Sequence, residues 1–228
     1  MELRHASRTE SERLRTPDAV IWDFNGTLID DLDLVLHAVN LQLSRRDLQP
    51  LIRDRYRDVF GFPVSDYYRR IGLDVDGESM AALSDEFFSA YRPGLVECDL
   101  YPGVLDALQA FARCEARQFV LSAMEETMLR SMLRHLDIDE YFEAAYGLAH
   151  LEGDSKLSRG RELMSDQNID PSRALLIGDT RHDAEVATML DMSAALVSTG
   201  HQSVERLAAA GWPVFPSAVA VARAACGS

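Results

Sequence analysis

Three apolar, β-prone runs in this sequence end in side chains that could do chemistry. They are residues 19–22 followed by Asp23, residues 118–121 followed by Ser122, and residues 174–177 followed by Gly178 and Asp179. Ligands of open α/β sheets sit at the carboxyl ends of the strands, so parallel pairing would gather these side chains in one crevice. Crowded carboxylates repel one another unless a cation lies between them, and hard oxygen ligands beside a phosphate suit Mg²⁺. The pattern therefore predicts a site for Mg²⁺ and a phosphate group.

The first of these segments reads A-V-I-W-D-F-N-G-T-L from Ala19 to Leu28. Asn25 and Gly26 are typical of a turn, so the strand would deliver Asp23 onto a glycine-containing loop. Taken alone, the segment is equally compatible with a strand and a turn in which Asp23 only caps the next helix. Thr27 adds a hydroxyl that could face phosphate oxygens.

Two further residues extend the predicted site. Asp183 lies four residues after Asp179, in the loop or first helical turn that follows the strand. Lys156 is the single lysine among 23 basic residues, the other 22 being arginine. A lone ammonium suits a place that needs a compact point charge instead of a planar fork, although an arginine-rich composition could also retain one lysine by chance.

The elements that would position these residues fall into two groups. No strand pattern occurs between Asp30 and Cys98, where apolar residues recur at helical spacing. From Val96 onward strand and helix patterns alternate, which is typical of a parallel sheet covered by helices. The expected helices are residues 32–43, 47–58, 64–71, 78–91, 102–114, 127–135, 157–168, 183–190, 204–210 and 217–225, and the expected strands, besides the three above, are residues 144–148, 194–197 and an edge strand at 214–215.

Composition narrows the possible partners. The formal net charge of −14 disfavours nucleic acid, and an anionic substrate would need a local positive site. Cys98, Cys114 and Cys226 show no metal-ligand spacing and fit a reducing cytoplasm. Residues 1–18 are polar and lack the apolar segment of a signal peptide, so we expect a disordered tail. No run approaches the roughly 18 apolar residues of a membrane span, and we expect no membrane association.

The order D-x-x-G-T-L, an apolar strand ending in Ser, one Lys, and an apolar run into G-D-x-x-x-D resembles the haloacid dehalogenase-like hydrolase superfamily. The helical segment directly after the first motif resembles its phosphoglycolate-phosphatase-like branch. The resemblance implies an α/β fold, a Rossmann-like parallel sheet flanked by helices, with an inserted all-helical cap domain. Residues 19–30 and 99–228 would form the core domain and residues 31–98 the cap.

The resemblance also implies roles for matching residues. Asp23 would be the nucleophile that forms an aspartyl-phosphate. Mg²⁺ would be held by Asp23, the main-chain carbonyl of Asn25 and Asp179, with Asp183 in support from the first or second coordination shell. The phosphate-binding residues would be Thr27, Ser122, Ala123 and Lys156, and Lys156 would also act in catalysis by offsetting the charge on Asp23.

Asn25 departs from the family pattern, which has an aspartate there as general acid and base. An amide keeps the main-chain carbonyl for the metal but cannot carry a proton near neutral pH. The protein would then be a slow phosphatase or one that uses a good leaving group, or it would borrow another proton carrier, or bind a phosphorylated ligand without efficient turnover. His182 is the candidate carrier, although an ordinary loop histidine is the simpler interpretation.

Other branches of the superfamily fit less well. Phosphonate cleavage needs a Schiff-base lysine in the cap, and none occurs between Asp30 and Cys98. Dehalogenases have no use for the Asp179–Asp183 pair, and phosphomutases depend on the missing acid/base. We therefore expect a Mg²⁺-dependent phosphatase acting on a small phosphate monoester, as a monomer or homodimer. The cap would close over the crevice. Its arginines could meet an anionic substrate, although most such arginines are simply solvated, and the candidates are Arg45, Arg46, Arg53, Arg69 and Arg70.

Overall fold

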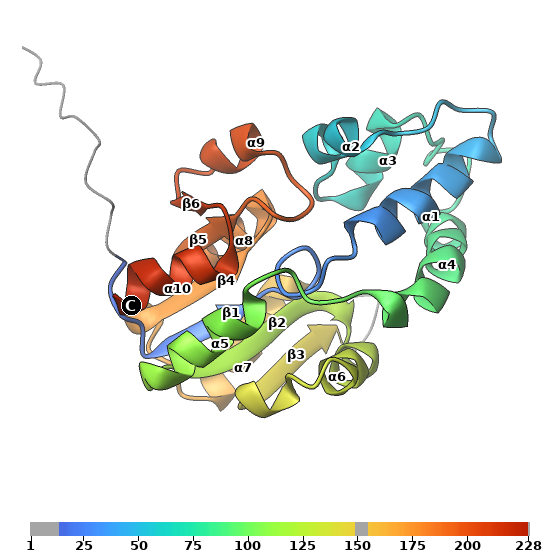
Figure 1. The fold of residues 1–228 in the computed structure, drawn as a ribbon. Helices are drawn as coiled ribbons and strands as arrows, with labels where there is room; N and C mark the ends of the chain where they lie inside the picture. Colours follow the sequence, from blue (N-terminus) through green and yellow to red (C-terminus); the bar gives the residue numbers. More distant parts are fainter. Residues whose placement is uncertain (1–13, 149–154, 228) are drawn as a thin grey trace, which may run out of the picture.

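The computed structural model describes residues 14–148 and 155–227, and a six-stranded parallel sheet forms its centre (Figure 1). The strand order is β3-β2-β1-β4-β5-β6, so β1 lies between β2 and β4. The strands are β1 (Ala19–Trp22), β2 (Arg117–Glu125), β3 (Ala144–Leu148), β4 (Ala174–Gly178), β5 (Ser193–Val197) and β6 (Val214–Phe215). The α/β class, the parallel sheet and the edge position of β6 are thereby confirmed.

Both faces of the sheet are buried under apolar side chains. Successive residues of a strand point to opposite faces, so each strand contributes to both. Val20 and Trp22 of β1 pack into one apolar cluster, while Ala19 and Ile21 pack into another. This is why the central strands are continuous apolar runs instead of alternating ones.

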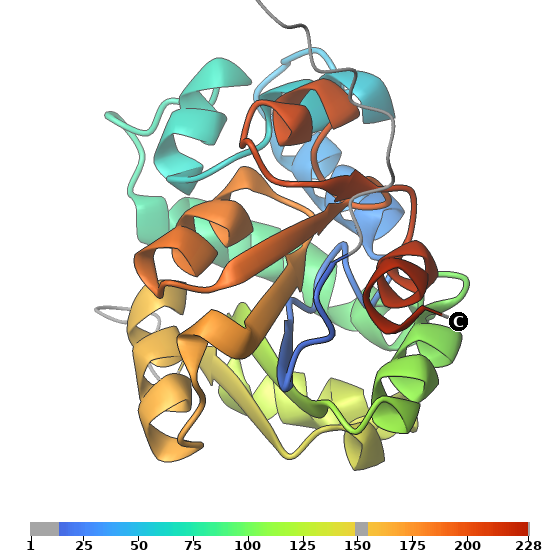
Figure 2. The ribbon, with the colours of Figure 1, turned by 90° about the vertical axis from the view of Figure 1, so that its left-hand side faces the viewer.

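Two layers of helices cover these faces (Figure 2). On one side α5 (Val104–Arg113), α6 (Glu126–His135) and α10 (Ala218–Cys226) contribute to the first cluster. On the other side α7 (Lys156–Asp166) and α8 (Arg181–Met189) contribute to the second. The remaining short elements are α9 (Val204–Ala208) and the 3₁₀ helices η2 (Asp139–Tyr141) and η3 (Pro171–Arg173).

Residues 31–98, called the insert below, stand apart from the helices that cover the sheet (Figure 1). Their elements are α1 (Leu32–Ser44), α2 (Arg53–Val59), α3 (Val64–Arg70), α4 (Met80–Tyr91) and the 3₁₀ helix η1 (Arg92–Glu97). The apolar stripe predicted on the first of these, Leu32, Val35, Leu36, Val39 and Leu43, is buried. The insert carries none of the six strands, as the sequence predicts.

Two predicted boundaries were wrong by more than two residues. Helix α2 begins at Arg53 and not at Asp47, because Asp47 has a left-handed φ of 53° and Pro50 cannot donate a helical hydrogen bond. Strand β2 continues past Ser122 to Glu125, with a shift in its register against β3 between Leu121 and Glu125.

The predicted tail of residues 1–18 falls partly outside the described residues, and its last five residues are ordered against the core. Pro17 is buried, and the Thr16 hydroxyl donates to the carbonyl of Ala225 at 2.9 Å. Asp18 pairs with Arg173 through its side chain. These contacts join the segment to α10 and η3, so the expectation of disorder was wrong for residues 14–18.

No helix among the residues described here is both long enough and apolar enough to cross a bilayer. Cys98, Cys114 and Cys226 are free thiols.

Two buried tyrosines of the insert give a matched test of packing. The hydroxyl of Tyr67 has no partner within the described chain, whereas that of Tyr56 lies 3.1 Å from Nδ1 of His201. An unpaired buried hydroxyl costs about 1–3 kcal/mol, so Tyr67→Phe should raise the free energy of unfolding and Tyr56→Phe should lower it by about 1 kcal/mol. Urea unfolding of both variants measures this. Equal losses in the two variants would contradict it.

Candidate active site

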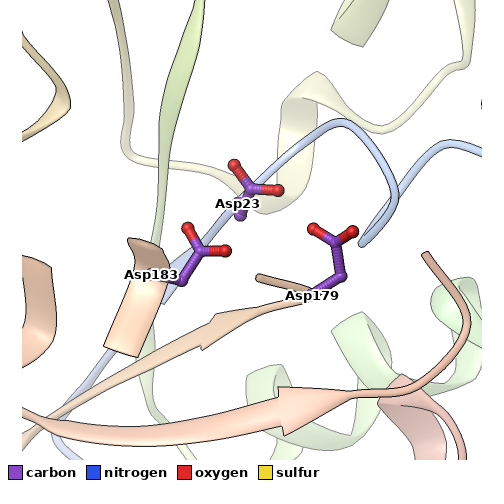
Figure 3. A group of neighbouring side chains, drawn as sticks. All are labelled: Asp23, Asp179 and Asp183. Atoms are coloured by element: carbon purple, nitrogen blue, oxygen red, sulfur yellow. The ribbon is translucent and has the colours of Figure 1, made fainter. Parts of the chain in front are cut away.

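Three carboxylates meet at the carboxyl ends of the central strands. Asp23 directly follows β1 and Asp179 follows β4, its neighbour in the sheet, while Asp183 lies in the first turn of α8. Each offers one oxygen within 4.8 Å of the others, and Figure 3 shows the three side chains around one space. All three are at most 7 % exposed. The predicted gathering of carboxylates is therefore present in the structure.

Lys156 joins this group from the start of α7. Its ammonium contacts Oδ1 of Asp23 and lies 2.5 Å from Oδ1 of Asp183. The helix begins here because the Ser155 side chain forms a capping box with Ser158. Lys156 is thus the first residue of the helix and not beside it, and its side chain is held between two carboxylates.

Of the predicted phosphate-binding residues, Ser122, Ala123 and Lys156 line the cavity described below, whereas Thr27 is buried beside the carboxylates. The Thr27 hydroxyl lies 3.2 Å from Oδ2 of Asp23 and 3.3 Å from Oδ1 of Asp179, so it bridges the two carboxylates. Ser122 is buried, and its hydroxyl accepts a hydrogen bond from the backbone N–H of Met124 at 3.1 Å. Ala123 is exposed and lines the cavity described below.

Asn25 belongs to a hydrogen-bond network that the sequence analysis did not predict. Its amide nitrogen donates to Oδ2 of Asp31 at 2.9 Å and to the Tyr91 hydroxyl at 2.8 Å. Tyr91 in turn donates to Asp31 at 2.8 Å, and Nε2 of His201 lies 3.0 Å from the other oxygen of Asp31. The insert thereby contacts the core within this network, through Tyr91 with Asn25 and through Tyr56 with His201.

The sequence also contains a signal for His201, which the prediction of the site missed. His201 follows β5 as part of the loop Ser198–Thr199–Gly200–His201, so the strand-end rule that selected Asp23 and Asp179 also covers it. Its backbone N–H donates to Oδ2 of Asp179 at 2.6 Å. A Cβ at Gly200 would lie 2.1 Å from that same oxygen, so only glycine lets this loop approach the carboxylate.

Charge is concentrated here to an unusual degree. Among the residues that the structure describes, the buried aspartate, lysine and histidine side chains are Asp23, Asp31, Asp179, Asp183, Lys156 and His201. Burial lowers the pKa of His201, but Asp31, Asp179 and Asp23 together raise it to about 9. Four carboxyl groups thus lie close to the cationic side chains of Lys156 and His201. With all four carboxyl groups ionised the site would lack two positive charges, which a divalent cation would supply.

The pKa values of the three aspartates are shifted by burial and by neighbouring charges. Burial raises the pKa of Asp179 to about 8 and also raises the pKa of Asp23. Against the effect of burial, the ammonium of Lys156 lowers the pKa of Asp183. Asp183 also accepts hydrogen bonds from the backbone N–H and hydroxyl of Thr180, so both its oxygens are engaged. The longest contacts are those of Oδ2 of Asp23 and Oδ1 of Asp179 with the Thr27 hydroxyl, at 3.2 and 3.3 Å, so these two oxygens are the best placed for a cation.

A cavity of about 290 Å³ opens over these residues, between the insert and the core. Its lining includes Asp23, Asn25, Ser122, Lys156 and Asp179. His182 also lines it, with its ring 4.7 Å from that of Phe62. The role of His182 as a proton carrier stays a prediction.

The family model described as haloacid dehalogenase-like hydrolase matches residues 20–197. The chain belongs to this family. The match begins in β1 and ends with β5, so it contains Asp23, Ser122, Lys156 and Asp179, whereas His201 lies just beyond it.

Individual relatives agree with this assignment, and a solved structure shows the same fold. A phosphoglycolate phosphatase of Rhodospirillum rubrum is 28 % identical over 200 residues, which cover 81 % of each chain. A phosphoglycolate phosphatase of Caulobacter vibrioides is 28 % identical over 83 % of this chain and 84 % of its own length. Among solved structures, a haloacid dehalogenase-like family protein of Streptococcus pneumoniae has the same fold, with a TM-score of 0.78, 18 % identity, and coverage of 90 % of this chain and 96 % of its own.

Proposed function

We propose that this protein is a Mg²⁺-dependent phosphatase that hydrolyses a small phosphate monoester through an aspartyl-phosphate on Asp23. The observation that carries the proposal is the meeting of Asp23 and Asp179, from neighbouring strands, with Lys156 in contact with Asp23. Residues 19–30 and 99–228 would form the catalytic core and residues 31–98 a cap that excludes water from the cavity.

The oxygen atoms that the site offers suit a divalent cation that prefers oxygen ligands. Asp23 and Asp179 offer carboxylate oxygens, and the main-chain carbonyl of Asn25 would complete the protein ligands. Asp183 would act from outside the coordination shell of the cation, by holding Lys156 and the start of α8. When bound, Mg²⁺ would supply positive charge against the phosphoryl oxygens.

In the first step a carboxylate oxygen of Asp23 attacks phosphorus, the new O–P bond forms, and the ester P–O bond breaks. The departing alcohol oxygen takes a proton from solvent, since the Asn25 amide cannot donate one near neutral pH. Water then attacks phosphorus, the bond to Asp23 breaks, and inorganic phosphate leaves. Lys156, Ser122 and Thr27 would hold the phosphoryl oxygens throughout.

A second candidate is a protein that binds a phosphorylated ligand with little turnover. The observation that favours it is the arrangement of Asn25, whose amide nitrogen is fully engaged by Asp31 and Tyr91. A panel of small phosphate monoesters, assayed with Mg²⁺ and with a chelator, separates the two. The phosphatase predicts Mg²⁺-dependent release of phosphate, and binding without release supports the second candidate.

The raised pKa of Asp179 predicts that Mg²⁺ displaces a proton. Because a carboxyl with a pKa of about 8 is protonated below that pH, Mg²⁺ affinity should fall by up to about tenfold per pH unit below 8 and level off above it. Calorimetry at pH 7 in two buffers of different ionisation enthalpy should show release of about one proton. Asp179→Asn should bind Mg²⁺ weakly and release none. Affinity that is constant between pH 6 and 8 would contradict this.

A further inference from the structure

The cavity has two chemically different ends. The core contributes carboxylates, Ser122 and Lys156, whereas the insert contributes mostly aromatic side chains. The aromatic residues of the insert that line the cavity include Tyr56, Phe60, Tyr67, Phe87, Phe88 and Tyr91. A phosphate at the polar end would therefore leave the rest of its substrate against an aromatic wall.

The wall consists of two groups of rings, and within each group the rings pack on one another. The ring centroids of Phe60 and Tyr67 are 5.2 Å apart, and those of Phe87 and Tyr91 are 5.3 Å apart. The first pair comes from the end of α2 and from α3, and the second from α4. Phe60 and Phe87 are only half-buried, so they keep surface that a ligand could cover. Aromatic faces favour apolar and aromatic partners over charged ones.

The arginines expected to meet an anionic substrate do not line the cavity. Arg46 pairs with Glu78 and Glu86, and Arg45 also pairs with Glu86. The remaining contacts of this kind are Arg53 with Asp33, Arg69 with Asp66 and Asp76, and Arg70 with the carbonyl of Val59. The expectation that these side chains read the substrate was therefore wrong.

The cations that do line the cavity are mostly engaged. Lys156 is held by Asp23 and Asp183, and His201 by Asp31. Arg92 is exposed, and its guanidinium lies 5.2 Å over the Phe88 ring. Glu125 also lines the cavity and adds negative charge. Among the described residues, a second anionic group on the substrate would thus meet aromatic rings, carboxylates and the exposed Arg92, with no free buried cation to receive it.

We propose that the alcohol part of the substrate is uncharged, apolar and about the size of one aromatic ring. The proposal rests on the phosphatase function and deepens it. A cavity of about 290 Å³ lies at the lower end of small-molecule pockets, about 300–1,000 Å³, which limits the substrate to a compact molecule. This substrate class differs from phosphoglycolate, whose second group is a carboxylate.

Binding of two non-hydrolysable phosphonates tests the proposal independently of turnover. Benzylphosphonate presents a ring, and phosphonoacetate presents a carboxylate, each beside the same phosphonate group. With Mg²⁺ present, calorimetry should show benzylphosphonate binding at least about tenfold tighter, since a well-filled apolar pocket discriminates on that scale. Benzyl phosphate should exceed phosphoglycolate in kcat/KM by a similar factor, the two having alkoxide leaving groups.

Variants of the wall give the matched comparison. Ser84 lines the cavity from α4, and Ser84→Lys should shift the preference toward phosphonoacetate. Phe60→Leu should weaken benzylphosphonate binding without affecting inorganic phosphate. Phe142→Leu changes an equally half-buried phenylalanine outside the cavity and should alter neither.

The outcomes separate the two proposals. Phosphonoacetate binding as tightly as benzylphosphonate, with inorganic phosphate also bound, overturns the substrate class and leaves the phosphatase standing. Absence of binding by inorganic phosphate and both phosphonates, together with no turnover of either ester, overturns the phosphatase and the substrate class with it.

Discussion

Replacement of Asp23 by Asn should remove Mg²⁺-dependent turnover of phosphate monoesters, with a loss of at least about 10⁴-fold in kcat. The amide nitrogen cannot attack phosphorus, and the change also removes a charged ligand for the cation. Lys156 would at the same time lose one of the two carboxylates that hold it. Phosphate release from benzyl phosphate, compared with wild type, measures the effect.

Loss of the fold must be separated from loss of chemistry in this variant. Burial raises the pKa of Asp23, so ionised Asp23 is disfavoured in the folded site and a neutral amide of similar size should be tolerated. Urea unfolding of Asp23→Asn should therefore show stability equal to or above that of wild type. A folded variant that kept more than about a hundredth of the activity would show that Asp23 is not the nucleophile.

The second large effect concerns Asn25 and Asp31 together. The Asn25 amide nitrogen lies 2.9 Å from an Asp31 oxygen, so Asn25→Asp alone would place two carboxyl groups in contact. Two carboxylates at that distance cannot both ionise, and the new group would share a proton with Asp31 instead of accepting one from water. Asn25→Asp alone should therefore give only part of the gain expected from a general acid and base.

The double variant Asn25→Asp with Asp31→Asn exchanges the two groups and keeps an amide–carboxylate pair. It should raise kcat for benzyl phosphate by about 10²-fold or more, within the range typical of general acid–base catalysis. Asp31→Asn alone serves as the control and should give no gain. If the double variant is no faster than wild type, Asn25 does not limit turnover.

The sequence predicted the central part of the site well because it depends on local signals. Apolar runs such as residues 174–177 can only be buried strands in this context, and parallel pairing sends their carboxyl ends to one edge. Asp23, Ser122 and Asp179 follow from that rule alone. Lys156 was selected because it is the single lysine of the sequence, and the family resemblance gave it a role. Its position depends on the packing of α7 and could not be obtained from spacing.

The parts that escaped prediction depend on tertiary contacts. Asp31 was assigned only to the start of the insert, yet it is 1 % exposed and pairs with His201, 170 residues away. The arginines of the insert have charges that suit a phosphate, but nearby carboxylates such as Glu86 already pair with Arg45 and Arg46. Helical periodicity cannot distinguish a substrate-binding arginine from one in a surface ion pair.

The most direct test of the account is to find where the phosphoryl group goes. Wild-type protein mixed with Mg²⁺ and an activated aryl phosphate should be quenched in acid and mapped by peptide mass spectrometry. Because Asn25 cannot activate water, hydrolysis of the intermediate should be slow, and phosphate should accumulate on the peptide that contains Asp23. This phosphorylation should be absent without Mg²⁺ and absent in the Asp23→Asn variant. Phosphorylation of another residue, or Mg²⁺-dependent turnover with no label on Asp23 at any quench time, would contradict the account.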